Sequence, residues 1–254
     1  MNPLLKLSQV KKNFGGVVAI DNLDLEIHAG EIFALIGPNG AGKTTVVNLV
    51  TGLLPIDGGK IHFDGADITG RRPHKIAASG LVRTYQHGRL FDRLSVEENI
   101  MLGGYAGSGS SPWQAIVQNE SFRQREAELR ERAWRLIEDF NLTDDAQRTT
   151  KDLPYGHRRM VELARALVHR PKLVLMDEPA AGLNSREVVE LSNIIRQLRD
   201  SGVTIFIIEH NMGMVMSLST KISVLNFGKR IAVGAPSEIR SNPDVVRAYL
   251  GEVE

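Results

Sequence analysis

The first part of the chain alternates apolar and polar positions with a short period. From Leu4 to Ile27, apolar runs are separated by turn residues, and positions 23–27 read Leu-Asp-Leu-Glu-Ile. Alternation with a period of two is typical of strands with one buried face, so this region predicts a small antiparallel sheet. Residues 31–36 then form an apolar run of strand length, and residues 44–50 continue with helical spacing. A further turn and strand are expected at 57–63.

Helical spacing dominates the middle of the chain. From residue 71 or so to residue 170, strand signals give way to a helical pattern. Within the segment 121–140, the apolar residues that share one helical face are Phe122, Leu129, Ala133, Leu136, Ile137 and Phe140. A stripe of this kind predicts an amphipathic helix that rests on other helices.

The strand signal returns after residue 171. Residues 172–176 form a nearly continuous apolar run, which is typical of a strand buried on both faces of a parallel sheet. A helical segment at 185–199 leads to a second such run at 203–208, so the order strand, helix, strand predicts a right-handed parallel crossover. A closing hairpin is expected over 222–233 and a short final helix over 242–250.

Composition and charge limit the classes of protein that fit. A chain of 254 residues that is 42% hydrophobic can bury a sizeable core, and its length fits one large domain or two small ones. Its 31 basic and 30 acidic side chains give a net charge of +1, which lacks the basic footprint of a nucleic-acid-binding domain. The absence of cysteine excludes disulfides and Cys-based zinc sites. No apolar run approaches the roughly 18 residues that span a bilayer, so we expect a soluble polypeptide or one that meets a membrane through a partner.

A glycine-rich run carries the most specific chemistry. Residues 37–45 read Gly-Pro-Asn-Gly-Ala-Gly-Lys-Thr-Thr and fit the phosphate-loop pattern G-x-x-x-x-G-K-[ST]. In this pattern, backbone N–H groups close around phosphate oxygens, the lysine supplies a cation and the first Thr hydroxyl can ligate Mg²⁺. The expected strand before it and helix after it aim a helix N-terminus at the anion, whereas a chance match in a glycine-rich loop is the alternative. The predicted nucleotide-binding residues are Gly37, Pro38, Asn39, Gly40, Ala41, Gly42, Lys43, Thr44 and Thr45, with Thr44 also a metal ligand.

Two carboxylates follow the apolar run at 172–176. Asp177 and Glu178 end a strand predicted to be buried, which is costly unless a cation meets them. Mg²⁺ prefers oxygen ligands, so we predict Asp177 as its ligand and Glu178 as the general base toward an attacking water. An exposed acidic helix cap is the alternative. His210 follows the next strand, where ligands gather in open α/β sheets, and we expect it to contact the γ-phosphate or the water rather than act as an ordinary loop residue.

These motifs occur in an order that resembles the ATPase subunits of ABC transporters. The stretches that carry the resemblance are the phosphate loop, Gln86 after a strand, 153–157 before a helix with Ala-Arg-Ala-Leu at 164–167, 173–178, 181–184 and 209–210. The resemblance implies an α/β fold, with a P-loop NTPase (RecA-like) core around a mostly parallel sheet, an N-terminal antiparallel β subdomain and an inserted α-helical subdomain. It implies a single ABC ATPase domain over 1–254, in which 1–86 and 171–254 form the nucleotide-binding core and 87–170 the helical subdomain with the signature.

Further site residues follow only from this resemblance. Phe14 is similar to the aromatic residue that stacks on adenine, although the family more often has Tyr there, and by itself it would be a hydrophobic plug beside Gly15. Gln86 resembles the Q-loop residue, which reaches Mg²⁺ and the attacking water while its loop contacts the membrane partner. Asn184 takes the position of the D-loop Asp, and His210 takes that of the switch histidine.

The signature segment departs from the common sequence Leu-Ser-Gly-Gly-Gln. In the family, this segment binds the γ-phosphate of ATP that the opposite subunit holds. Here Pro154 replaces the Ser and supplies neither a hydroxyl nor an N–H group, Tyr155 replaces the first Gly, Gly156 is kept and His157 replaces Gln. The phosphate contact is then expected from the amides around Gly156 and from the helix dipole. Without the other motifs, this segment would be only a turn that enters a helix.

Longer stretches are similar to one subfamily. Residues 83–91, 153–159, 177–184 and 242–251 resemble the ATP-binding subunit of the branched-chain (hydrophobic) amino acid importers of bacteria and archaea. The resemblance implies ATP and Mg²⁺ as cofactors, and a second identical or homologous ATPase subunit, transmembrane permeases and a solute-binding protein as partners. It implies a peripheral place on the cytoplasmic side of the cell membrane and no nucleic acid. Subunits that serve urea uptake or lipopolysaccharide export stay open, as do a soluble ABC ATPase of translation or repair and a phosphate-loop kinase or GTPase.

Overall fold

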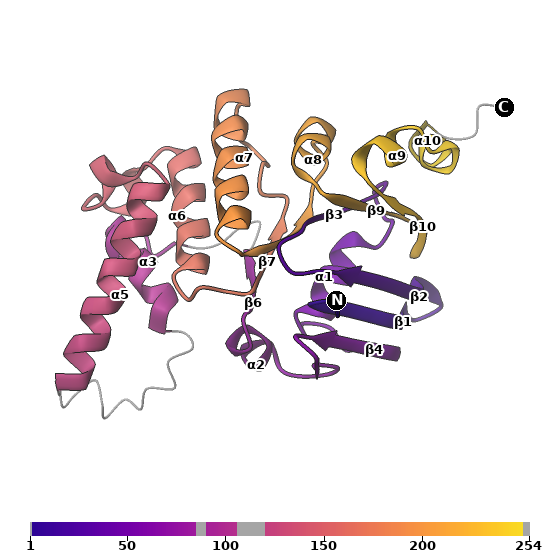
Figure 1. Cartoon of the computed structure of the whole chain (residues 1–254), viewed down its shortest axis with the longest axis horizontal. Coiled ribbons are helices and arrows are strands. Elements are labelled where there is room, and N and C mark those ends of the chain that lie inside the picture. The colour runs from indigo at the N-terminus through magenta and orange to yellow at the C-terminus, as the bar shows by residue number, and fades with distance from the viewer. Residues whose placement is uncertain (1, 85–89, 106–119, 251–254) are drawn as a thin grey trace.

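Figure 1 shows the chain as a computed structural model, which describes residues 2–84, 90–105 and 120–250. The strands form two sheets, and the helices group around them, with α3, α5 and α6 together at the left of the view and the antiparallel strands at the lower right (Figure 1). Among the described residues, no helix combines the length and the apolar character that crossing a bilayer requires.

The smaller sheet is antiparallel and has the strand order β2-β1-β4-β5. Its strands are β1 (Leu5–Phe14), β2 (Val17–Ile27), β4 (Gly58–Phe63) and β5 (Ala66–Asp67). Leu5 of β1 pairs with Ile27 on one side and with Phe63 on the other, and all three side chains are buried. The alternating sequence therefore folds as predicted, with its apolar positions on one face.

The larger sheet has the strand order β10-β9-β3-β8-β7-β6. Its strands are β3 (Ile32–Ile36), β6 (Leu81–Thr84), β7 (Leu173–Asp177), β8 (Thr204–Ile208), β9 (Lys221–Asn226) and β10 (Lys229–Gly234). Only β10 pairs antiparallel within it. The mostly parallel sheet predicted for the core is thus confirmed, and β7 and β8 are adjacent and parallel, as the strand, helix, strand order requires.

The helices with their bounds are α1 (Lys43–Val50), α2 (Pro73–Ala78), α3 (Val96–Tyr105), α5 (Glu120–Asp139), α6 (Tyr155–Leu167), α7 (Ser185–Asp200), α8 (Met212–Leu218), α9 (Pro236–Arg240) and α10 (Pro243–Leu250), with short 3-10 turns at Thr143–Asp145 and Thr150–Asp152. The hydrophobic pattern, which predicted helical structure from residue 71 onward, missed β6, the edge strand of the parallel sheet, whereas the resemblance correctly placed a strand before Gln86. A strand of four residues is too short to show a period of its own. The division of the chain at residues 86 and 170 stays a prediction.

Alternate residues of the parallel strands enter different cores. Ile205 and Ile207 of β8 pack with α3, α5, α6 and α7, whereas Phe206 and Ile208 pack with α1 and the antiparallel sheet. Phe206 meets Phe33 of β3 edge to face, with ring centroids 5.7 Å apart. Both faces of the parallel sheet are therefore covered. A ligand can therefore bind at the edge where the parallel strands end. At this edge, Leu35 of β3 and Asp177 of β7 both pair with Ile208 of β8.

Candidate functional site

The phosphate loop connects the end of β3 to the start of α1. Gly42 is the N-cap of α1 and has φ of 103°, and a Cβ on it would lie 2.8 Å from the carbonyl oxygen of Ala19, so only glycine fits. Lys43 is buried inside the loop and donates from Nζ to the carbonyl oxygens of Gly37 at 2.7 Å and Pro38 at 2.9 Å. The first turn of α1 also presents the exposed Thr44. The loop therefore brings a buried ammonium and a helix N-terminus together, which are two features that bind phosphate oxygens.

Electrostatics around Lys43 favour an anionic ligand. Burial lowers the pKa of Lys43, and the nearby carboxylates of Glu178 and Asp177 oppose this effect. A buried ammonium with few charge partners gains most when phosphate enters, because phosphate restores the solvation that burial removed. The lysine is thus prepared for a polyphosphate rather than for a structural ion pair.

Asp177 lies at the carboxyl end of β7 and is only 5% exposed. Its Oδ2 accepts a hydrogen bond of 2.7 Å from Nη2 of Arg83 on β6, and Nη1 of Arg83 donates to Oδ1 of Asn48 on α1, also at 2.7 Å. Arg83 therefore joins three elements behind the phosphate loop. Sequence reasoning assigned it no role, since an isolated Arg before a loop has no distinctive pattern.

The residues around Asp177 suit Mg²⁺ bound together with a phosphate ligand. Within the described part of the chain, His, Cys, Asp and Glu side chains form no cluster of three or more that would hold a metal by themselves. Mg²⁺ needs only one or two protein ligands, since water and substrate phosphates complete its octahedron. Asp177, whose Oδ2 is paired with Arg83, and the hydroxyl of the exposed Thr44 stay the predicted members of such a sparse set. Gln86, the other predicted metal ligand, lies outside the described residues.

Glu178 and His210 meet across the ends of two neighbouring strands. Nε2 of His210 lies 2.9 Å from Oε1 of Glu178, and their side chains are 47% and 27% exposed. Glu178 has φ of 48°, in the left-handed region, and its N–H donates to the carbonyl of Ile208 at 2.8 Å. The Glu178 carboxylate is thus partly exposed and its His210 partner half exposed, so a water can reach both.

The buried carboxylate of Glu209 connects the loop after β7 to the loop after β8. It is 4% exposed, and Oε1 accepts from the N–H of Ala180 at 2.7 Å while Oε2 accepts from the N–H groups of His210 at 2.8 Å and Asn211 at 3.0 Å. A buried carboxylate with three N–H donors is well compensated and fixes the loops that it joins. The sequence signal was present, because Glu209 stands beside His210, but only the histidine received a role.

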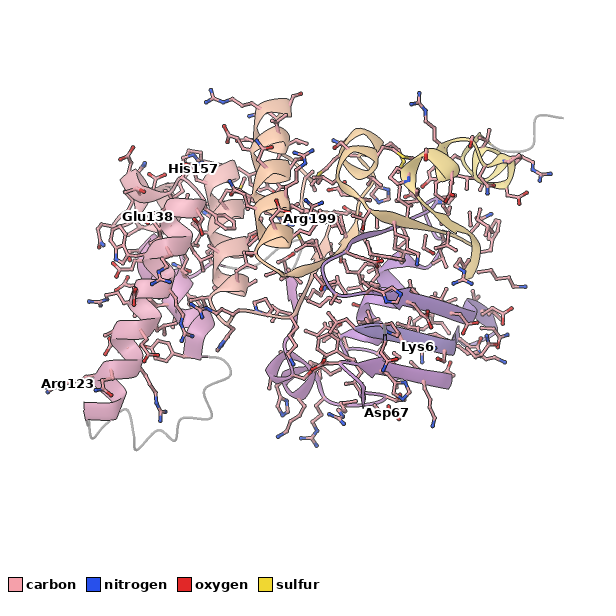
Figure 2. All side chains as sticks on the ribbon, viewed as in Figure 1. Lys6, Asp67, Arg123, Glu138, His157 and Arg199 are labelled. Carbon is pink, nitrogen blue, oxygen red and sulfur yellow. The ribbon has the colours of Figure 1, made fainter. Side chains whose placement is uncertain are left out.

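The signature residues lie at the start of α6, on the helical side of the molecule. Figure 2 shows His157 at one end of that group, far from Lys6 and Asp67 in the antiparallel sheet. Nδ1 of His157 lies 2.5 Å from Oδ2 of Asp145, so its ring is held within the chain. A Cβ on Gly156 would lie 2.3 Å from Oε1 of Glu187 on α7, so a larger residue here would displace that side chain.

Three further predicted residues have clear local environments. The Tyr155 hydroxyl donates to the carbonyl oxygen of Ala181 at 3.1 Å. Asn184 caps α7, and its Oδ1 accepts from the N–H groups of Arg186 and Glu187 at 3.0 and 3.1 Å. Phe14 is half exposed at the end of β1, with Nζ of Lys12 5.5 Å from its ring centroid. The ring is open to a base, and nucleotide contacts for all three residues stay predictions.

A phosphate loop at the end of β3, an imidazole after the adjacent strand β8 and two carboxylates at the end of β7, the next strand beyond it, define a P-loop nucleoside triphosphatase. The ABC transporter family profile matches residues 20–181, and the profile for the branched-chain amino acid ATP-binding cassette transporter matches residues 229–254. The chain therefore belongs to the ABC transporter family, as a subunit that binds and hydrolyses ATP.

Relatives and solved structures match over almost the entire chain. The high-affinity branched-chain amino acid transport ATP-binding proteins BraF of Pseudomonas aeruginosa and LivG of Escherichia coli are each 42% identical over 251 residues, covering 98% of this chain and 98% of each relative. A crystal structure of an ATP-binding cassette of an ABC transporter in its ADP conformation superposes with a TM-score of 0.86 at 32% identity, covering 99% of this chain and 100% of that chain. A nucleotide-free cassette gives a TM-score of 0.84 at 31% identity, covering 98% of this chain and 100% of that chain.

Proposed function

We propose that this chain powers the uptake of branched-chain or other hydrophobic amino acids. The observation that carries this proposal is the 42% identity over 98% of the chain to BraF and LivG, both described as high-affinity branched-chain amino acid transport proteins. The transported solute never contacts an ATPase subunit. The similarity to BraF and LivG therefore supports the solute class only indirectly, because each ATPase subunit works with its own transporter.

In this proposal, ATP binds with its phosphates in the loop 37–45. Lys43 and the N–H groups at the start of α1 hold the phosphate oxygens, and Phe14 stacks on the adenine. Thr44 and Asp177 hold Mg²⁺, which when bound neutralises charge on the phosphates, and Gln86 reaches the same metal and the water. The carboxylate and hydroxyl at these positions are ligands of the right hardness for this ion.

Hydrolysis then follows by in-line attack of a water. Glu178 orients the water and accepts its proton. His210, through its 2.9 Å contact, holds the Glu178 carboxylate in place toward the γ-phosphate. The barrier falls because Lys43 and the helix N-terminus already face the charge that develops on the transferred group, and Mg²⁺, when bound, would neutralise part of that charge. No covalent intermediate with the chain is required.

A second ATPase subunit completes each site. Its signature at Tyr155, Gly156 and His157 would meet the γ-phosphate held by the first chain through backbone amides, with Asn184 beside it. Because Pro154 has neither a hydroxyl nor an N–H group, the contact rests on the amides near Gly156 and on the dipole of α6. The partner is a second copy of this chain or a homologous subunit.

Permease subunits would dock in a groove beside β6. A cavity of about 530 Å³ lies between α2, β6, α3 and α6, and its apolar wall includes Ala77, Val82, Phe91, Leu102 and Ala166. An apolar groove of this kind suits a helix from a membrane partner. Movement there would couple closure of the ATPase pair to transport. The chain would then be peripheral on the cytoplasmic side of the membrane, meeting it only through permeases, with a solute-binding protein in the same system and no nucleic acid.

Reconstitution tests this proposal. The chain is coexpressed with candidate permeases and a solute-binding protein of a branched-chain amino acid importer, and ATP hydrolysis is measured with leucine, with urea and without solute. We expect copurification with the permeases and stimulation by leucine. Stimulation by urea alone, or transport of lipopolysaccharide outward, would replace the amino acid assignment. Failure to copurify with any membrane protein would favour a soluble ABC ATPase.

A further inference from the structure

The loop between β7 and α7 is held from outside through its backbone. This segment, residues 177–182, is here called the carboxylate loop, and it begins with Asp177 and Glu178. Its members adopt no regular hydrogen-bonded ladder after β7, and Glu178 and Gly182 both have positive φ, of 48° and 77°. A non-glycine residue such as Glu178 keeps a positive φ only where neighbouring groups fix it, whereas glycine adopts one without strain. The groups that do so come from α6 and from the residue that follows β8.

Arg159 of α6 grips the first half of the carboxylate loop. Its Nη2 donates to the carbonyl oxygens of Asp177 at 3.4 Å and Glu178 at 3.3 Å, and its Nε donates to that of Pro179 at 3.3 Å. The residue is only 3% exposed, and its Nη1 donates to Glu162 at 2.8 Å. Several hydrogen bonds at once compensate for the burial of a guanidinium. The ammonium of a lysine lacks the planar set of donors needed to form all of them.

Tyr155 grips the second half of the same loop. It lies one turn before Arg159, so both side chains project from the same face of α6. Its hydroxyl donates to the carbonyl oxygen of Ala181 at 3.1 Å, and a Cβ on Gly182 would lie 2.9 Å from Cε1 of its ring. The ring therefore rests directly on the Gly182 backbone, although 54% of the residue is exposed.

The opposite side of the carboxylate loop is fixed to β8. The N–H of Ala180 donates to Glu209, and the N–H of Glu178 donates to the carbonyl of Ile208. The carbonyl oxygens of the carboxylate loop are thus held by α6, while N–H groups are held by the edge of the sheet. A shift of α6 relative to the sheet would act on Glu178 through these contacts.

We propose that Tyr155 and Arg159 are positioning residues that tie Glu178 to the signature helix α6 of the same chain. This inference rests on the proposed role of Glu178 as general base. The first turn of α6 is the element expected to contact ATP held by the partner. A movement of α6 caused by that contact would be transmitted through Tyr155 and Arg159 to Glu178 of the same chain. Tyr155 occupies the position where the common signature has a glycine, and its phenol supplies a contact within the chain that glycine lacks.

The inference predicts a loss in turnover with ATP binding preserved. In the purified full-length chain, we expect Arg159→Lys to lower kcat by about 10- to 100-fold, because small misplacements of a catalytic group are costly. We expect Tyr155→Phe, which keeps the ring and loses one hydrogen bond, to lower kcat by about 3- to 10-fold. KM and the Kd for ATP should stay within about twofold, because the phosphate loop is untouched.

Matched controls separate positioning from folding and from a direct phosphate contact. Arg158→Lys changes the neighbouring arginine, whose ion pair with Asp92 is largely exposed, and Tyr105→Phe removes a hydroxyl on α3. Both should keep wild-type kcat. If Arg159→Lys lowers the melting temperature sharply, Tyr155→Phe, a change at a half-exposed side chain, decides the question.

Two results would overturn the inference. One is a wild-type kcat in Tyr155→Phe, and the other is a raised KM with unchanged kcat, which would show that the Tyr155 hydroxyl contacts ATP instead of positioning Glu178. Glu178→Gln is measured in parallel. If that variant hydrolyses ATP normally, Glu178 is not the general base. If Glu178→Gln stalls while Tyr155→Phe is fully active, only the positioning role of Tyr155 is refuted.

Discussion

Nε2 of His210 lies 2.9 Å from Oε1 of Glu178, although the two residues are 32 positions apart in the chain. The contact arises because β7 and β8 are adjacent, parallel and in register at their ends, where Asp177 pairs with Ile208. Residues that immediately follow the two strands are thereby brought face to face. When the carboxylate is ionised, Nε2 must carry the hydrogen, so the histidine fixes the direction in which Glu178 can accept a proton from water.

The Glu178→Gln variant should bind ATP and stall. An amide keeps the shape of the side chain but cannot accept a proton, so we expect hydrolysis to fall by about 10²- to 10⁴-fold. The Kd for ATP, measured by fluorescence titration, should change little, because Lys43 and the loop around it are unaltered. Turnover at the wild-type rate in a single-turnover assay would remove Glu178 from the mechanism.

The His210→Ala variant should be impaired less severely. It leaves the carboxylate of Glu178 in place and removes only the group that orients it, so we expect kcat to fall by about 10- to 100-fold. His210→Gln, which restores a donor, should recover part of this loss. His74→Ala provides the control, because His74 is an exposed residue on α2. Equal activity in the two alanine variants would leave His210 without a role in hydrolysis.

The Arg83→Gln variant should lose stability in a way that Mg²⁺ relieves. It leaves Asp177 buried without the guanidinium that now lies 2.7 Å away, and breaking a buried pair costs roughly 3–5 kcal/mol. Thermal unfolding with and without Mg²⁺-ADP should show a larger gain for the variant than for the wild type. Arg186→Gln, which breaks the exposed pair with Glu190, should change stability by no more than about 1 kcal/mol. Similar melting temperatures for both variants would contradict this account of Arg83.

Much of the fold and of the site could be predicted from the sequence, for physical reasons. Alternating and continuous apolar runs report which faces of a strand are buried, so both sheets were expected. The phosphate loop, Asp177-Glu178 and His210 lie in short contiguous motifs, whose chemistry depends on local spacing. Arg159 and Glu209 were not recognised, because an arginine on an amphipathic helix and an acid beside a histidine look like solvent-exposed residues until tertiary packing buries them.

Stability should depend on pH through Glu162. Burial raises the pKa of Glu162 above its ordinary value of 4.5, and the hydrogen bond from Arg159 only partly opposes this. Between the two pKa values the folded state binds more protons than the unfolded state, so lowering the pH through that window favours folding. The free energy of unfolding of the wild type, minus that of Glu162→Gln, should rise as the pH falls toward 4.5 and then level off. A difference that falls with acidification would reverse the sign and refute the assignment.

The Gly156→Ala variant should strain the junction between α6 and α7. The new Cβ would lie 2.3 Å from Oε1 of Glu187, whose Oε2 accepts from the N–H of Asn184 at 2.8 Å in the cap of α7. Relieving the clash therefore disturbs the cap, and we expect a loss of about 1–3 kcal/mol in urea unfolding. Gly16→Ala, at a site with open space and an ordinary φ, should change stability little.

A double variant identifies the source of that loss. Glu187→Ala removes the atom with which the new methyl group collides, so Gly156→Ala should cost less in the Glu187→Ala background than in the wild type. Residues in direct contact give such non-additive effects, whereas independent residues do not. Strict additivity in the free energies of unfolding would show that Gly156 is kept for a reason other than its contact with Glu187.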